Sequence, residues 1–120
     1  MLAKDGVMRW NVPGVDFSAH SAHIESLEAE LAQIVAGVEL RAAQVPFYST
    51  VTGELLDTAG LDAGYWYRNL RQPVRFQAAV EALAEQGYGA FVEVSSHPVL
   101  TASVQDVADA AVVVGTLRRE

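Results

Sequence analysis

The stretch Ala90-Phe-Val-Glu-Val-Ser-Ser-His-Pro-Val-Leu100 decides the fold. Residues 90–94 are almost continuously apolar, which predicts a short buried strand. The turn at 95–98 leads into a predicted helix, and a second apolar run at 111–114 predicts a last strand that ends at Gly115. Strands that alternate with helices in this way predict an α/β fold.

Upstream of this unit the same alternation continues. Pro73 suits the first turn of a helix that ends at Gly87, with Phe76, Val80 and Leu83 facing inward. Asp62 can cap a short helix over residues 65–70. The β-branched and aromatic run 45–51 predicts a strand, and a turn at 52–54 predicts a hairpin with Leu55-Leu56.

The most regular pattern follows Ser21. Its apolar residues recur at helical spacing: Ile24, Leu27, Leu31, Ile34 and Val38. Ser21 is the expected N-cap, early glutamates suit the positive end of the helix dipole, and Gly37 is the expected stop. Before this helix, residues 7–12 predict a strand that Pro13-Gly14 breaks.

Composition limits the class of protein. The 120 residues suffice for one small domain, and an apolar fraction of 51% indicates a chain that forms a core. The net charge of −7 disfavours nucleic acid as a partner. No apolar run approaches the roughly 20 residues of a membrane span, the first residues do not resemble a secretion signal, and cysteine is absent. These features predict a cytoplasmic protein with no membrane partner.

His20 is the leading candidate for catalysis. It ends the segment Phe17-Ser18-Ala19-His20, between a predicted strand and the amphipathic helix, where rigid neighbours can fix the direction of a general base. The sequence contains no Gly-x-Ser-x-Gly elbow to provide a nucleophile. The pattern therefore predicts one part of an active site, although a histidine with no catalytic role remains the alternative.

Other clusters have two interpretations. His20, His23 and His97 could ligate a metal, but three scattered imidazoles without carboxylates at helical spacing favour no metal site. The arginines Arg68, Arg71 and Arg75 could meet a phosphate or an acidic partner, or they could form a solvated helix face. The run Tyr65-Trp-Tyr67 favours core packing over a ligand site.

Several motifs together resemble the C-terminal part of the acyltransferase domain of modular type I polyketide synthases, which are related to malonyl-CoA:acyl carrier protein transacylases. The motifs that carry the resemblance are Val15-Asp-Phe-Ser-Ala-His-Ser21, Val45-Pro-Phe-Tyr-Ser-Thr-Val-Thr-Gly53, Tyr65-Trp-Tyr-Arg-Asn-Leu-Arg-Gln-Pro-Val-Arg-Phe76, Phe91-Val-Glu-Val-Ser-Ser-His-Pro-Val-Leu-Thr101 and Val114-Gly-Thr-Leu-Arg-Arg119. Their order and spacing agree over essentially the whole chain.

The resemblance implies a mechanism. In this family a serine takes the acyl group from acyl-CoA as an ester, and the group then passes to the phosphopantetheine thiol of an acyl carrier protein. The catalytic histidine of the family corresponds to His20. The backbone carbonyl that orients the imidazole would lie near Gln72, with Asn69 as the alternative.

The family's serine elbow, oxyanion hole and carboxylate-binding arginine lie upstream of the matched region. The resemblance therefore implies that this chain alone does not transfer acyl groups. It places residues 1–14 at the end of a ferredoxin-like small subdomain, 15–114 in the C-terminal part of a hydrolase-like large subdomain, and 115–120 at the start of a linker. The implied partners are an acyl carrier protein, the remainder of the acyltransferase domain, an adjacent ketosynthase and acyl-CoA; no bound cofactor or metal is implied.

The signature Phe17-Ser18-Ala19-His20 matches neither Tyr-Ala-Ser-His of methylmalonyl-selective relatives nor His-Ala-Phe-His of malonyl-selective ones. Ala19 replaces the bulky phenylalanine of the malonyl type, so the expected substrate has an α-substituent: methylmalonyl, a bulkier unit or a branched starter acyl group. The alternatives from another class are a stand-alone α/β interaction module without catalysis and a partly folded fragment.

Overall fold

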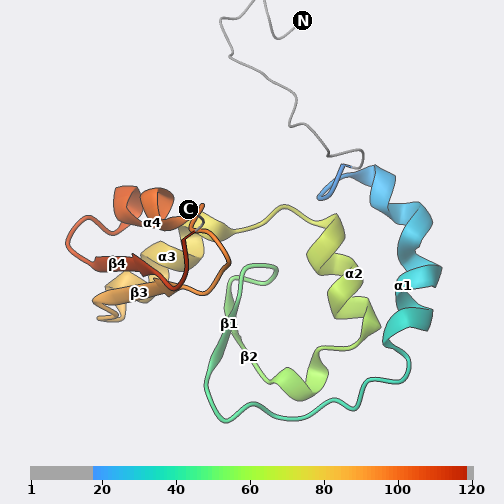
Figure 1. The fold of residues 1–120 in the computed structure, drawn as a ribbon. Coiled ribbons are helices and arrows are strands. Elements are labelled where there is room, and N and C mark those ends of the chain that lie inside the picture. The colour runs from blue at the N-terminus through green and yellow to red at the C-terminus, as the bar shows by residue number, and fades with distance from the viewer. Residues whose placement is uncertain (1–17, 119–120) are drawn as a thin grey trace, which may run out of the picture.

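The computed structural model describes residues 18–118, so the predicted strand at 7–12, the small subdomain and Phe17 lie outside the described part. The elements are η2 (Ala22–Leu27), α1 (Glu28–Val35), β1 (Phe47–Ser49), β2 (Glu54–Leu56), η3 (Thr58–Gly60), α2 (Ala63–Arg71), α3 (Phe76–Glu85), β3 (Ala90–Glu93), α4 (Thr101–Val107) and β4 (Val112–Gly115). Figure 1 shows α1 beside α2 on one side, α3, α4, β3 and β4 on the other, and the β1–β2 hairpin between them. The predicted α/β class is confirmed.

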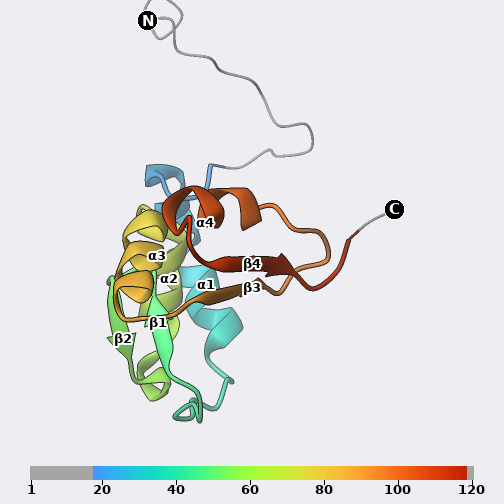
Figure 2. The same ribbon diagram turned by 90° about the vertical axis from the view of Figure 1, so that its left-hand side faces the viewer.

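The β3–β4 pair is the centre of one half of the structure. The two strands are parallel, with Ala90 opposite Val112 and Glu93 opposite Gly115. Helix α4 connects them and packs on one face, as Figure 2 shows. The core beneath that face contains Val80, Val104 and Ala108, with Phe91 and Val113 packed against it. The parallel pair is therefore covered by helices on this side.

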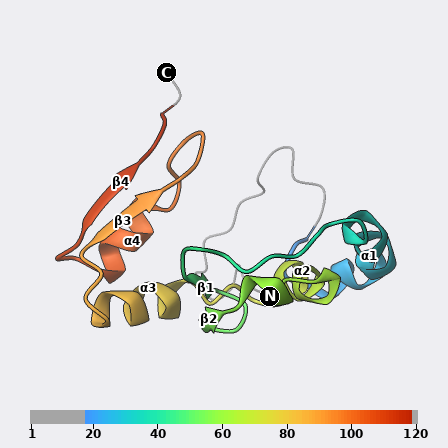
Figure 3. The same ribbon diagram turned by 90° about the horizontal axis from the view of Figure 1, so that it is seen from below.

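The opposite face of the same pair is apolar and exposed. Val92, Val112 and Val114 are 58%, 63% and 47% exposed. In Figure 3, α4 lies against one face of β3 and β4, and no described helix or strand covers the other face. The expectation that residues 90–94 are buried is therefore wrong: Phe91 and Glu93 are half-buried, and the other three residues are exposed. Successive side chains of a strand point to opposite faces, so an apolar run is buried throughout only where both faces are covered.

The helix predicted from Ser21 is present with one difference: its first six residues form the 3₁₀ helix η2. Helix α1 ends at Val35, and Gly37 directly follows its C-cap Ala36, as predicted. The hydroxyl of Ser21 accepts a hydrogen bond from the backbone N–H of His23, so the predicted N-cap is confirmed. Ile24 is buried, at 1% exposure, but Ile34 is 67% exposed, so the described residues cover the apolar stripe only in part.

The boundaries of α2 and α3 are partly as predicted. Asp62 caps α2 by accepting from the Tyr65 N–H at 2.8 Å, which confirms that prediction. The placement of Pro73 in the first turn of a helix is wrong, because α3 begins at Phe76. The Arg75 N–H donates to the carbonyl of Thr50 at 2.9 Å, which holds residues 72–75 against the hairpin as a linker.

A buried hydrogen bond connects the hairpin with α2. The predicted hairpin is confirmed, with β1 and β2 antiparallel. At the end of β1, Ser49 is completely buried and its hydroxyl lies 2.8 Å from the phenol oxygen of Tyr65. The Tyr65 ring also packs edge-on against Phe47. Helix α2 is therefore fixed against the hairpin, and this contact also restrains the C-terminal end of α2.

Glu93 shapes the turn that follows β3. Its carboxylate accepts hydrogen bonds from the backbone N–H groups of Val99, Leu100 and Thr101, at 2.8–3.1 Å. These N–H groups lie at the start of α4, where no residue of the helix itself can accept from them. The hydrogen bonds, above all that from Val99, hold the pKa of the Glu93 carboxyl below its ordinary value, since they favour the charged form.

Replacing Glu93 by glutamine is expected to lower the stability of the folded protein at neutral pH. A carboxyl whose pKa is lowered on folding stabilises the fold above its unfolded pKa, about 4.3, and loses this contribution as the pH falls through the folded value. The difference in thermal unfolding midpoint between wild type and Glu93→Gln should therefore shrink below about pH 4. Glu85→Gln, on the exposed end of α3, is the matched control. A difference that stays constant across this range would contradict the assigned role.

None of the helices within residues 18–118 is long and apolar enough to cross a membrane.

Candidate active site

His20 occupies an unusual backbone position just before η2. Its φ is +58°, the only positive value at a non-glycine residue within residues 18–118. This left-handed conformation is uncommon for residues with a Cβ and requires support from the surroundings. The support comes from the C-terminal end of α2, where the carbonyl of Leu70 accepts from the His20 N–H at 2.7 Å.

The ring of His20 is held by the same end of α2. Its Nδ1 lies 2.7 Å from the carbonyl oxygen of Gln72, the residue that follows α2. A carbonyl can only accept, so Nδ1 carries the proton and donates it. In the neutral ring this leaves the lone pair on Nε2, which is the atom that can take a proton from a nucleophile. Within the described residues, Asn69 makes no hydrogen bond to this ring.

The two residues before His20 are also brought to this position. Ser18 is exposed and Ala19 is half-buried, and the hydroxyl of Ser21 donates to the carbonyl of Ser18 at 2.7 Å. This bond closes the loop around Ala19 and His20. Phe17, the remaining residue of the signature, lies outside the described part.

The nucleophile is not found beside the base. Across residues 18–118, no hydroxyl group forms a hydrogen bond with Nε2 of His20. In the same range no three histidine, aspartate or glutamate side chains lie together as a possible metal site, and His23 and His97 do not join His20 in one. The described residues therefore orient the imidazole of His20 and fix its tautomer. None of their hydroxyl groups forms a hydrogen bond with Nε2.

An ion pair connects η2 with the end of α2. The Arg71 guanidinium donates from Nε and Nη2 to one carboxylate oxygen of Glu25, at 3.0 and 2.8 Å. Arg75 donates to the carbonyl of Thr52. Two of the three clustered arginines thus have partners within the chain. No local sequence pattern predicts the pair of Glu25 and Arg71, because its members are 46 positions apart.

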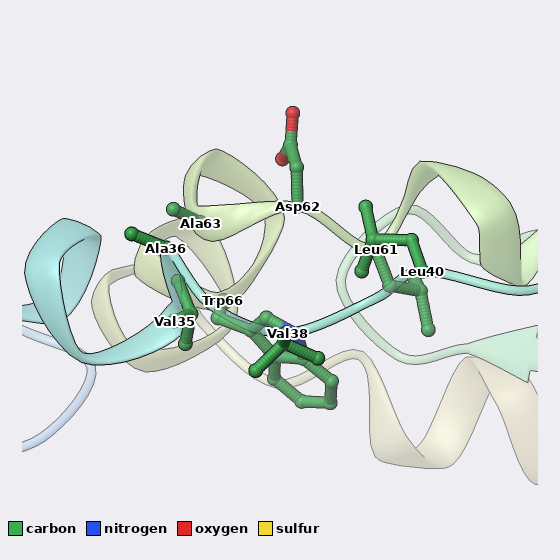
Figure 4. Close-up of a pocket in the computed structure, with 8 residues that line it drawn as sticks. All are labelled: Val35, Ala36, Val38, Leu40, Leu61, Asp62, Ala63 and Trp66. Carbon is green, nitrogen blue, oxygen red and sulfur yellow. The ribbon is translucent and has the colours of Figure 1, made fainter.

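The apolar cavities of the described structure lie elsewhere. Figure 4 shows one of about 240 Å³ between the end of α1 and the start of α2, with Trp66 in its wall and the carboxylate of Asp62 pointing away. It lies at the opposite end of α2 from Gln72, roughly 15 Å along the helix axis. A second, of about 390 Å³, is lined by residues of the hairpin, α3, β3 and α4. Neither is lined by His20, so neither is a pocket at the base.

Comparisons with known proteins show the family to which the chain belongs. The family described as "Acyl transferase domain" matches residues 1–120. Polyketide synthase GfsA of Streptomyces halstedii is 57% identical over 110 residues, which cover 88% of this chain and 2% of that protein. Erythronolide synthase EryA3 of Saccharopolyspora erythraea is 50% identical over 113 residues, which cover 88% of this chain and 4% of that protein.

Solved structures show the same similarity in three dimensions. The acyltransferase domain from module 8 of the salinomycin polyketide synthase superposes with a TM-score of 0.89 at 49% identity, covering 98% of this chain and 29% of that one. A loading acyltransferase from the avermectin modular polyketide synthase gives 0.85 at 42% identity, with 98% and 37% covered. The chain thus spans about a third of these solved chains and a few per cent of the curated relatives.

Proposed function

The chain belongs to the acyltransferase domain family of modular polyketide synthases, and on that premise we propose that it supplies the histidine of a serine–histidine acyltransferase site. The observation that carries this proposal is the hydrogen bond from Nδ1 of His20 to the Gln72 carbonyl. It fixes both the tautomer and the direction of the ring, which are the two properties a general base needs.

The serine belongs to the remainder of the domain, which the similar solved chains contain in addition to the region that this chain matches. In the first step Nε2 of His20 takes the serine proton while the serine oxygen attacks the thioester carbonyl of acyl-CoA. The tetrahedral intermediate then expels the coenzyme A thiolate, which receives that proton from the imidazolium. An ester between the acyl group and the serine remains.

The second half runs the same proton path in reverse. The phosphopantetheine thiol of an acyl carrier protein gives its proton to Nε2 and attacks the serine ester. The carbon–oxygen bond breaks and the serine oxygen takes the proton back, so the enzyme returns to its first state. No metal or bound cofactor takes part. The partners of this chain are accordingly the rest of the domain, acyl-CoA and a carrier protein, with a neighbouring ketosynthase in the same synthase.

The function is tested with the complete domain that includes this chain. Incubation with an acyl-CoA should give a domain whose intact mass has increased by one acyl group, and peptide mapping should place the ester on a serine outside residues 1–120. Addition of a phosphopantetheinylated carrier protein should remove the adduct and acylate the carrier. A complete domain that forms no adduct with any acyl-CoA would favour the alternative of a non-catalytic interaction module.

The acyl group is proposed to have an α-substituent: methylmalonyl, a bulkier unit or a branched starter. Ala19 directly precedes His20 and is half-buried, and its methyl group takes up far less space than the phenylalanine of the malonyl type would. Replacing Ala19 by phenylalanine should fill that space and shift preference toward malonyl by roughly 10-fold to 200-fold, since a methyl group in a pocket is worth about 1–3 kcal/mol. The measurement is the ratio of acyl adducts from an equimolar mixture of malonyl-CoA and methylmalonyl-CoA.

Ala22→Phe, on the exposed side of η2, is the matched control for this substitution and should leave the ratio unchanged. A wild-type domain that prefers malonyl would contradict the proposed substrate class.

The proposed division of the chain into residues 1–14, 15–114 and 115–120 follows the same family pattern. Arg68, which is exposed on α2, is the proposed contact for an acidic carrier protein, because Arg71 is already paired.

A further inference from the structure

We propose that the ion pair between Glu25 and Arg71 is a positioning device for His20, an inference that rests on the proposed function of His20 as the base. Glu25 lies on η2, five residues after His20. Arg71 is the last residue of α2 and directly precedes Gln72. The pair therefore connects the two segments whose separation determines the hydrogen bond between the imidazole and the Gln72 carbonyl.

Among the described residues, three polar contacts connect the His20 segment and η2 with the end of α2. The first two are the hydrogen bonds from the His20 N–H to Leu70 and from Nδ1 to Gln72, both 2.7 Å. Apolar packing already holds η2 against α2, since Ile24 is buried, but such packing is not directional. The Glu25–Arg71 pair is the third polar contact, and it constrains the small shifts of η2 relative to the Gln72 carbonyl that apolar packing still allows.

The chemistry of the pair suits this task. Arginine presents two donors in a fixed plane, and here Nε and Nη2 both reach the same oxygen of Glu25. A lysine in this place would offer one point charge on a flexible stem and would define the orientation less well. The two side chains are 33% and 56% exposed, so water screens the pair and its effect on global stability is small.

The expected consequence appears in the chemical step. Without the Glu25–Arg71 pair, the His20 imidazole can shift away from its position between the nucleophile and the thioester. A displacement of about 1 Å can reduce a rate by about 100-fold. Glu25→Gln and Arg71→Gln should therefore each lower kcat of acyl transfer by about 10-fold or more, with KM for acyl-CoA nearly unchanged.

The experiment uses the complete domain with four variants: Glu25→Gln, Arg71→Gln, Arg71→Lys and the exchanged pair Glu25→Arg with Arg71→Glu. The exchanged pair restores opposite charges across the same gap and should recover part of the lost kcat, and Arg71→Lys should fall between wild type and Arg71→Gln. Glu39→Gln is the matched control, because it removes an ion pair that does not involve η2 or α2. That pair joins Glu39 to Arg41, and each of the two side chains is 77% exposed. Thermal unfolding midpoints of all variants should stay close to that of wild type.

Two outcomes would overturn the inference: kcat values of the single variants within about twofold of wild type, or a loss of kcat that is matched by an equal loss of folded protein. Failure of the proposed function would give a different result. In that case a complete domain in which His20 is replaced would keep full activity.

Discussion

Replacement of His20 by asparagine in the complete domain is expected to lower the rate of acyl-enzyme formation by about 10²-fold to 10⁴-fold, the range typical of a lost general base. Asparagine is chosen because it adopts positive φ more readily than most residues, so it can keep the backbone at +58°. Its amide cannot take a proton from a serine. The loss should therefore appear in kcat and leave binding of acyl-CoA nearly unchanged, as measured by single-turnover acylation and by titration.

The matched control is His23→Asn, three residues further along and exposed on η2. It should retain wild-type rates. His20→Ala is a useful second variant, since it removes the ring and also places an ordinary residue in the left-handed region, so it should lower both the rate and the thermal unfolding midpoint. A domain with asparagine at position 20 that acylates at the wild-type rate would refute the proposed mechanism.

The second large effect concerns the chain by itself. The isolated 120 residues are expected to give no acyl adduct above the rate without enzyme. In the proposed mechanism the chain supplies the base, and the nucleophile comes from another part of the domain. In addition, one face of the β3–β4 pair and the end of α1 expose apolar side chains, among them Val92, Val112 and Ile34. A two-stranded parallel pair with one bare face is marginal in water, since such sheets are normally covered on both sides.

Adding the remainder of the domain as a separate polypeptide should restore measurable transfer and protect the amides of residues 90–94 from hydrogen exchange. The control is the same remainder mixed with the His20→Asn chain, which should give equal protection without activity. Acyl transfer by the isolated chain, with nothing added, would contradict the view that the site is shared between the two parts.

Local patterns predicted much of the fold because local interactions determine it. The Asp62 cap, the hairpin from residue 45 to residue 56 and the stop at Gly87, whose φ is +92°, each depend on residues a few positions apart. The errors arose where distant contacts decide. The prediction that Pro73 lies in a helix is wrong, because the hydrogen bond from the Arg75 N–H to Thr50 holds that segment outside α3. Residues 90–94 would be buried only if both faces of the β3–β4 pair were covered. A local sequence pattern does not show what covers the face opposite α4.

The candidate site divides in the same way. His20 was identifiable from its position in the chain, and the resemblance pointed to a carbonyl near Gln72. The left-handed backbone at His20 and the pair Glu25–Arg71 were not predictable, because both arise from the meeting of two segments about 50 residues apart. The role of Glu93 had a weak local signal: an acidic residue at the end of a strand, a short turn before the first N–H groups of α4.

The acceptors that hold His20 are both main-chain atoms, the carbonyls of Leu70 and Gln72. A main-chain acceptor is the same whichever side chain the residue has. Segments exchanged between homologous acyltransferase domains should therefore dock correctly in any recipient whose helix α2 ends with the same backbone turn. Chimeras that transplant residues 17–25 as one unit, together with a recipient arginine at position 71, should retain turnover better than those that transplant Phe17-Ser18-Ala19-His20 alone.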